Sequence, residues 1–155
     1  MEKTLEQKMA EYAKVEFDEE QMEQIRFGHE NGLSDEQVAK YAKAEFNRYQ
    51  MNQIRLGLEH GLSDAQVAHM AECAKAGFAG NQMEEIRRGY ENGLTNEQVS
   101  IYAKAGFSWE QMNEIRLGYI LGLTDEQVST YAKVGLGFKK MQQFRLGYES
   151  GLTDE

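Results

Sequence analysis

The chain has 155 residues, of which 41% are hydrophobic and 28% charged, and it contains no proline. This composition is typical of a globular protein, and a net charge of −9 argues against a general nucleic-acid binder, which needs Lys and Arg to replace phosphate counterions. The one cysteine, Cys73, excludes an internal disulfide and indicates a reducing compartment.

The first residues, MEKTLEQKMAEY, are charged and lack the apolar segment of a signal peptide. No apolar run approaches the roughly 18 residues that a membrane span needs. We therefore expect a cytoplasmic protein without membrane association.

One sequence pattern returns along the whole chain. A methionine recurs at steps of 29, 32, 29 and 29 residues: Met22, Met51, Met83, Met112 and Met141. Such a period is typical of stacked supersecondary units. We expect an all-α fold, a right-handed α-solenoid of five two-helix repeats with about ten short helices. One repeat domain would cover 1–155, with repeats at about 1–31, 32–60, 61–92, 93–121 and 122–150 and a stub at 151–155.

The first repeat is acidic, with nine acids and four bases. Four of its acids gather where its second helix is predicted to begin: Asp18, Glu19, Glu20 and Glu23. Negative charge in the first turn stabilises a helix through its dipole, which explains much of this cluster. An acidic patch that binds a basic partner is the other interpretation, and both stay open.

The second repeat shows how its two helices are specified. Ser34 and Gln37 form a capping box before a helix that ends near Glu45, and Asn47 and Gln50 form the next one. The same pairing recurs at Asp18/Gln21, Ser63/Gln66, Thr95/Gln98, Ser108/Gln111 and Thr124/Gln127. Agreement of several local signals in one register favours a defined fold.

Two glycines recur near the end of each second helix. Gly61 follows the helix and is expected to end it in the left-handed conformation. Gly57 lies inside the last turn, where glycine costs about 0.5–1 kcal/mol relative to alanine, and this position is shared by Gly28, Gly89, Gly118 and Gly147. We expect a neighbouring helix to cross so closely there that a Cβ atom would clash.

An arginine recurs at Arg26, Arg55, Arg87, Arg116 and Arg145. A row of guanidinium groups can bind phosphates or carboxylates. It can also pair with acids four residues later, as the spacing predicts for Arg26–Glu30, Arg55–Glu59, Arg87–Glu91 and Arg145–Glu149. The negative net charge favours this second interpretation.

The third repeat is irregular. It has three extra residues around His69 and Met70, Cys73 stands in place of the usual tyrosine, and Arg88 in place of leucine or phenylalanine. Three residues leave a helical wheel about 60° short of a full turn. We expect the first helix to lengthen and kink, or to bulge, either as a bend that shapes a groove or as a tolerated insertion.

Outward positions become apolar in the fourth and fifth repeats. Trp109 and Phe138 stand where the first two repeats have Glu19 and Arg48. At the other end of the helix, Ile120-Leu121 stands where those repeats have Glu30-Asn31 and Glu59-His60. Trp109 and Ile120 are about 20° apart on the wheel, on a face shared with Arg116. An aromatic and aliphatic surface beside an arginine has the composition of a binding hot spot. We expect a partner-binding patch, the alternative being burial against the next repeat or a second copy.

The sequence ends on Thr153-Asp154-Glu155, a predicted N-cap and the start of a further helix. The last full helix, with Phe144 and Tyr148, would then lack a covering neighbour. We expect either a longer array or an end that meets another molecule. Self-association through the fourth and fifth repeats is the resulting hypothesis.

No residue pattern indicates catalysis. His29, His60 and His69 have no ligand spacing, so we expect neither a metal site nor a cofactor. No nucleophile motif or glycine-rich phosphate loop is present either, and the chain is not expected to be an enzyme.

The recurring order YAK-x2-F, QM-x2-IR-x-G and GL[ST] resembles short helical tandem repeats of uncharacterised bacterial proteins, some on mobile elements. The resemblance covers the whole chain and implies a helical solenoid, but no activity. Those arrays often carry proline after Tyr-Ala-Lys, where this chain has Val15, Ala44, Ala76, Ala105 and Val134.

We therefore interpret the chain as a protein-interaction module or scaffold without catalytic activity. The alternative is an acidic inhibitor, or nucleic-acid mimic, that blocks a basic nucleic-acid-binding protein. Neither interpretation includes direct binding to nucleic acid.

Overall fold

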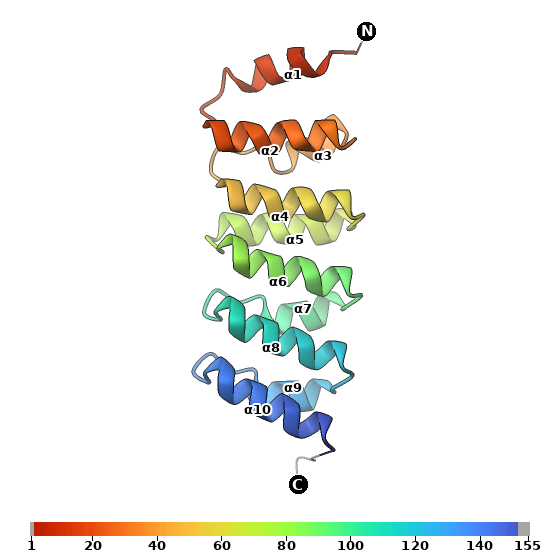
Figure 1. The fold of residues 1–155 in the computed structure, drawn as a ribbon, viewed down its shortest axis with the longest axis vertical. Coiled ribbons are helices and arrows are strands. Elements are labelled where there is room, and N and C mark those ends of the chain that lie inside the picture. The colour runs from red at the N-terminus through yellow and green to blue at the C-terminus, as the bar shows by residue number, and fades with distance from the viewer. Residues whose placement is uncertain (1, 152–155) are drawn as a thin grey trace. The chain divides into compact units, whose positions relative to one another are not determined.

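The computed structural model describes residues 2–151, and every regular element within them is an α-helix (Figure 1). The helices are α1 Leu5–Tyr12, α2 Glu19–Glu30, α3 Asp35–Ala39, α4 Arg48–Glu59, α5 Asp64–Lys75, α6 Gly80–Glu91, α7 Asn96–Tyr102, α8 Trp109–Ile120, α9 Asp125–Tyr131 and α10 Phe138–Glu149. The all-α prediction is confirmed for these residues. The predicted helix start at Thr153-Asp154-Glu155 lies outside them.

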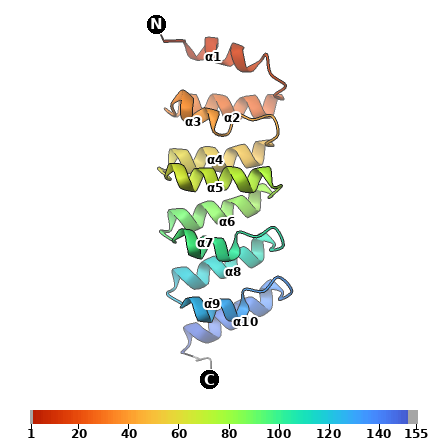
Figure 2. The same cartoon turned by 180° about the vertical axis from the view of Figure 1, so that it is seen from behind.

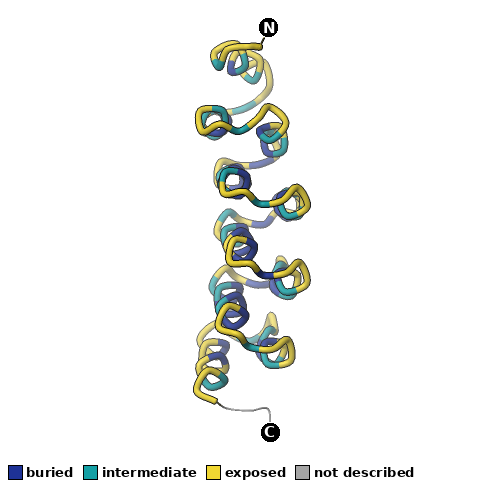
Figure 3. Tube along the Cα trace, turned by 90° about the vertical axis from the view of Figure 1, so that its right-hand side faces the viewer, coloured by how far each residue is buried: buried dark blue, intermediate teal, exposed yellow. Residues whose placement is uncertain are grey.

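Residue contacts group the chain into two compact parts, Met1–Met83 and Glu84–Glu155. In the N-terminal part α2 packs against α1, α3 and α4, and α4 packs against α5. In the C-terminal part α8 packs against α7, α9 and α10. In Figure 2, α3 and α5 of the N-terminal part, and α7 and α9 of the C-terminal part, lie in front of the second helices of the same part. Buried residues concentrate where the two sets of helices meet (Figure 3). One continuous domain over 1–155 stays a prediction.

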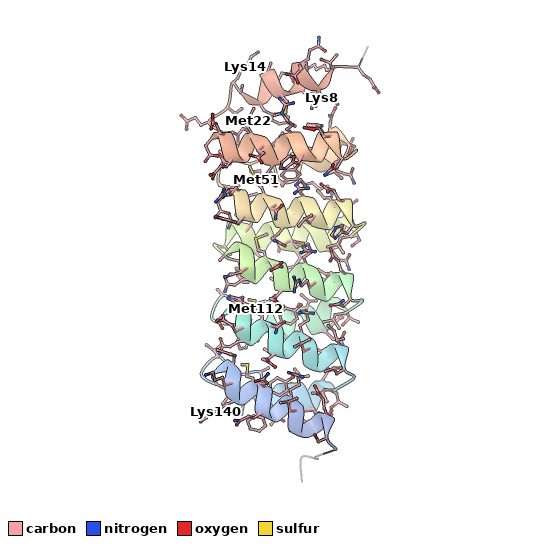
Figure 4. All side chains as sticks on the ribbon, viewed as in Figure 1. Lys8, Lys14, Met22, Met51, Met112 and Lys140 are labelled. Atoms are coloured by element: carbon pink, nitrogen blue, oxygen red, sulfur yellow. The ribbon has the colours of Figure 1, made fainter. Side chains whose placement is uncertain are left out.

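Side-chain caps fix where the helices begin. All the capping boxes expected from the sequence are present, and one more, Thr4 with Gln7, begins α1. Gly61 follows α4 with a φ of +86°, as expected for a left-handed helix end. Of the methionines that define the repeat, Met51, Met83, Met112 and Met141 are fully buried, whereas Met22 is partly exposed; Met22, Met51 and Met112 are labelled in Figure 4.

The cap of α6 is incomplete. The Ala79 amide donates to Gln82 Oε1 at 2.8 Å, but alanine has no side-chain oxygen that could accept a hydrogen bond in return. We expect Ala79→Ser to raise the free energy of unfolding by about 1 kcal/mol, the usual worth of an N-cap side chain. Urea unfolding followed by circular dichroism measures this, with the exposed Ala76→Ser as a control that should gain nothing. Equal stability of the two variants would contradict the prediction.

Three of the recurring glycines make room for tyrosine hydroxyl groups. An added Cβ atom would lie 2.0 Å from the hydroxyl oxygen of Tyr41 at Gly28, 1.9 Å from that of Tyr102 at Gly89, and 2.0 Å from that of Tyr131 at Gly118. Each hydroxyl donates to a carbonyl one turn earlier in the glycine's own helix: Gln24 at 2.7 Å, Glu85 at 2.8 Å and Glu114 at 3.3 Å. The predicted close approach exists, but a tyrosine side chain at or just after the end of the next helix makes it rather than a crossing helix backbone.

The extra residues of the third repeat lengthen its first helix, as predicted. α5 has 12 residues, against 5 in α3 and 7 in α7, and it is helical throughout. Gly77, at a φ of +97°, ends it in a Schellman motif, since the Phe78 amide donates to the Cys73 carbonyl at 3.0 Å. The added turn is therefore absorbed as regular helix without a bulge.

The substitution predicted for the third repeat needs a correction. Met70, not Cys73, takes the place of the tyrosine, because its sulfur would lie 3.4 Å from a Cβ atom at Gly57. Met70 is seven residues after the cap Ser63, as Tyr41 is after Ser34. In the third repeat, the position equivalent to the tyrosine is therefore found by counting seven residues forward from the N-cap. Counting back from the phenylalanine that follows the helix gives the wrong residue.

Candidate functional site

Two aromatic side chains stand exposed at the N-terminal ends of neighbouring helices. Trp109 begins α8 and Phe138 begins α10, with 41% and 38% of their surfaces accessible. Gln111 Nε2, in the first turn of α8, donates to the carbonyls of Val134 and Leu136 at 2.9 and 2.8 Å. This clamp fixes the loop that carries the exposed Val134, whose side chain lies 3.3 Å from the place that a Cβ atom at Gly106 would take. We call Trp109, Val134 and Phe138 the aromatic surface.

The N-terminal part carries charge at the equivalent place. Arg48 begins α4 and pairs with Glu20 of α2, with Nη1 and Oε1 3.1 Å apart. Its guanidinium also lies over the ring of Tyr49. The aromatic surface is therefore a property of α8 and α10 and is not imposed by the fold.

Ile120 and Leu121 are exposed, as predicted, but they do not join the aromatic surface. They lie at the opposite end of α8, and eleven residues of helix place Ile120 about 16 Å along the axis from Trp109. A small angle on the helical wheel does not make two side chains neighbours. The predicted patch is thus two separate exposed groups.

Arg116 was predicted to border the patch, and this prediction is wrong. Only 7% of Arg116 is accessible. Its Nε donates to Glu85 Oε2 at 2.8 Å, and its two Nη groups donate to Asn92 and Asn113 at 3.1 and 2.7 Å. With these groups engaged inside the protein, Arg116 is not available to a partner.

The other recurring arginines largely follow the predicted pairing within a helix. Salt bridges join Arg55 to Glu59, Arg87 to Glu91 and Arg145 to Glu149, at 2.6, 2.8 and 2.6 Å. The prediction for Arg26 is wrong, because it pairs with Glu6 of α1 at 3.2 Å rather than with Glu30.

Sequence reasoning missed a second partner that reaches back to the previous repeat. Arg145 Nε donates to Glu114 Oε2 at 2.8 Å, just as Arg116 does to Glu85. Burial opposes the charge of Arg145, but hydrogen bonds to Glu114 and Glu149 raise its pKa above the ordinary value. The signal was a polar residue 31 positions before Arg55, Arg116 and Arg145: Gln24, Glu85 and Glu114.

Part of the acidic patch has an internal role. Asp18 caps α2 through Gln21, and Glu20 pairs with Arg48. Glu19 and Glu23 are exposed and line a pocket with Met9, Phe17 and Arg26. Half of the four acids therefore have a structural explanation.

The residues singled out in the irregular third repeat lie in different surroundings. Met70 and Cys73 are buried, and burial followed by the charge of Glu72 raises the pKa of the Cys73 thiol to about 11. Burial lowers the pKa of the half-buried His69, while Arg88 pairs with Glu84 at 3.2 Å. At neutral pH the thiol is protonated, so Cys73 has no nucleophilic character.

Within residues 2–151, no group of three His, Cys, Asp or Glu side chains could hold a metal ion. None of the helices described there is long and apolar enough to cross a bilayer. Comparisons of the chain with protein-family models, curated proteins and solved structures found no match.

Proposed function

We propose that the chain is a non-catalytic, cytoplasmic protein-interaction module built as a right-handed α-solenoid of five two-helix repeats. The recurrence of the same contacts supports the repeat architecture: a tyrosine on a glycine, an arginine on an acid or amide, and a glutamine on two carbonyls. Each links residues of successive repeats, as a stacked array requires.

The aromatic surface carries the functional proposal. Exposed aromatic side chains are enriched in binding hot spots, and here they stand at the positions that Glu19 and Arg48 occupy in α2 and α4. The exposed Lys139 and Lys140 follow Phe138 directly. We therefore propose a protein partner that presents an apolar side chain flanked by acids.

Panning a displayed peptide library on the immobilised chain tests this. Selected peptides should combine an aromatic or large aliphatic residue with acids. Trp109→Ala/Phe138→Ala should weaken their binding at least about tenfold, the loss expected at a hot spot, as measured by fluorescence polarisation. Leu121→Ala, exposed at the other end of α8, is the matched control and should bind like the wild type.

Two outcomes would count against the aromatic surface. Peptides that bind the double variant undiminished would show that another surface is used. Selection of basic peptides, with binding lost on Glu19→Lys/Glu23→Lys and weakened by salt, would favour the acidic-inhibitor alternative instead.

A further inference from the structure

A histidine occupies one recurring position in the first repeat, where the other repeats carry leucine or tyrosine. His29 directly follows the recurring glycine of α2, and its equivalents in the later repeats are Leu58, Tyr90, Tyr119 and Tyr148. Leucine and tyrosine are uncharged at and below neutral pH, whereas the ordinary pKa of histidine is about 6.5. At mildly acidic pH this position therefore gains a charge in the first repeat alone.

The His29 ring is enclosed by three helices. Its side chain is only 5% accessible, and Nδ1 lies 3.8 Å from Asp35 Oδ1 at the start of α3. The ring of Tyr12, at the end of α1, lies against it, with the two ring centroids 5.9 Å apart.

The other ring nitrogen of His29 has no acceptor. Nε2 is buried and makes no hydrogen bond to any of the described residues. A neutral imidazole has one N–H group, which Nδ1 can direct toward Asp35, but a protonated imidazole has two. Protonation would therefore leave a buried donor without an acceptor, which is unfavourable.

Charges on the neighbouring helices also act on this ring. Lys8 of α1, labelled in Figure 4, pairs with Asp35 of α3, with Nζ and Oδ1 2.8 Å apart. Burial lowers the pKa of His29 below its ordinary value, the charge of Lys8 lowers it further, and the charge of Asp35 raises it. Because Asp35 is already engaged by Lys8, it only partly offsets the cost of a charge on His29.

Other charged groups of α1 to α4 have partners of their own or are exposed to solvent. The pairs are Glu6–Arg26, Lys3–Glu11, Lys40–Asp64, Glu20–Arg48 and Arg55–Glu59, and the exposed acids are Glu19, Glu23, Glu30 and Glu36. The balance at His29 is therefore set by its burial, Lys8 and Asp35.

α1 is held in place by few contacts. Of its eight residues only Met9 is buried, against seven of the twelve in α4. Two ion pairs join α1 to α2 and α3, and since both are partly exposed they add little stability: Glu6–Arg26 and Lys8–Asp35. An element secured in this way opens locally before the rest of its domain, so a small change at its interface decides whether it is docked.

We propose that His29 is a pH-sensitive switch: protonation of its buried ring releases α1 from α2 and α3, while α2 and α4 stay folded. When α1 leaves, the ring becomes hydrated and its pKa returns toward the ordinary value. Docking of α1 is therefore strongest above about pH 6.5. It weakens as the pH falls toward the lower pKa of the docked state, by up to about tenfold per pH unit.

Release of α1 changes the surface of the N-terminal part. α1 packs against α2, so its departure uncovers the apolar side chains between them, including Met9. The switch is independent of the aromatic surface, which belongs to α8 and α10.

Hydrogen–deuterium exchange of the full chain at pH 7.5 and 5.0, followed by mass spectrometry, tests the proposal. After correction for the pH dependence of intrinsic exchange, peptides of α1 should lose about tenfold in protection at pH 5.0, the effect of one pH unit within this range. Peptides of α4 should keep their protection.

Variants at the three histidines identify the group responsible. His29→Leu and His29→Tyr introduce residues that the later repeats carry, and α1 should stay protected at both pH values in each. Circular dichroism checks that both variants are folded. His60→Gln and His69→Gln are the matched controls and should lose α1 protection like the wild type.

Three results would overturn the proposal. The first is a wild type whose α1 protection is the same at both pH values. The second is an equal loss of α1 protection in the folded His29 variants. The third is an equal loss in α1 and α4, which would show acid unfolding of the whole N-terminal part.

Discussion

Gly89→Ala should lower the free energy of unfolding by about 3 kcal/mol, combining roughly 1–3 kcal/mol of overpacking with the loss of a buried hydrogen bond. The new methyl group would lie 1.9 Å from the Tyr102 hydroxyl oxygen and 3.2 Å from the ring carbon that carries it. Tyr102 is completely buried and donates to the Glu85 carbonyl. Its ring cannot move aside without breaking that bond, so the structure has no inexpensive relaxation. Urea unfolding measures the loss.

Gly57→Ala is the matched control for this prediction. Its Cβ atom would meet the flexible ends of Leu62 and Met70, at 3.0 and 3.4 Å, instead of a tyrosine hydroxyl. Its effect should stay within about 1 kcal/mol, because alanine gains helix propensity and the contacts can adjust. If Gly89→Ala were no worse than Gly57→Ala, the tyrosine explanation of the recurring glycines would be wrong.

Glu85→Leu should lower the free energy of unfolding by about 3 kcal/mol, the lower end for breaking a buried ion pair. Glu85 is 2% accessible and accepts Arg116 Nε, so the leucine would leave a buried guanidinium without its counter-charge. Arg116 would keep its bonds to Asn92 and Asn113, which places the loss at the lower end. Thermal and urea unfolding give the value.

Two further variants separate charge from packing at this site. Glu85→Gln should cost much less, because Gln24 occupies the equivalent position in α2 and accepts Arg55. Adding Arg116→Met to Glu85→Leu should recover much of the stability, since a buried ion pair can be exchanged for apolar side chains. A double variant as unstable as the sum of both single changes would rule out this coupling.

The helix starts could be predicted because their determinants are local. The N-cap Ser34 and its partner Gln37 lie three residues apart, so the local sequence alone shows both members of the capping box. The partner of Gly28 could not be found in this way, because Tyr41 lies 13 residues later in the sequence, in the turn that follows α3. Arg26 failed for a related reason: the i,i+4 rule ignores competing acids on neighbouring helices.

The candidate site was predictable in composition but not in arrangement. The exposure of Trp109 and Phe138 follows from their place in the capping register, just after the N-cap. Arg116 was misplaced because the helical wheel does not show that Glu85, 31 residues earlier, lies within hydrogen-bonding distance. Ile120 and Trp109 project in similar directions around the axis of α8 but lie at opposite ends of the helix. A helical wheel shows the direction of a side chain and not its position along the axis.

The clamp formed by Gln50 shows how the fold tolerates changes in length. Its Nε2 donates to the carbonyls of Ala74 and Phe78, four residues apart, whereas Gln21 uses carbonyls two residues apart. One amide group therefore fastens both the long α5 and the short α3 to the helix before it. The first helices can therefore differ in length without loss of the glutamine clamp. Grafting the additional turn of α5 into another repeat should change the outer surface of that repeat, while the glutamines of the second helices still reach the carbonyls that they bind.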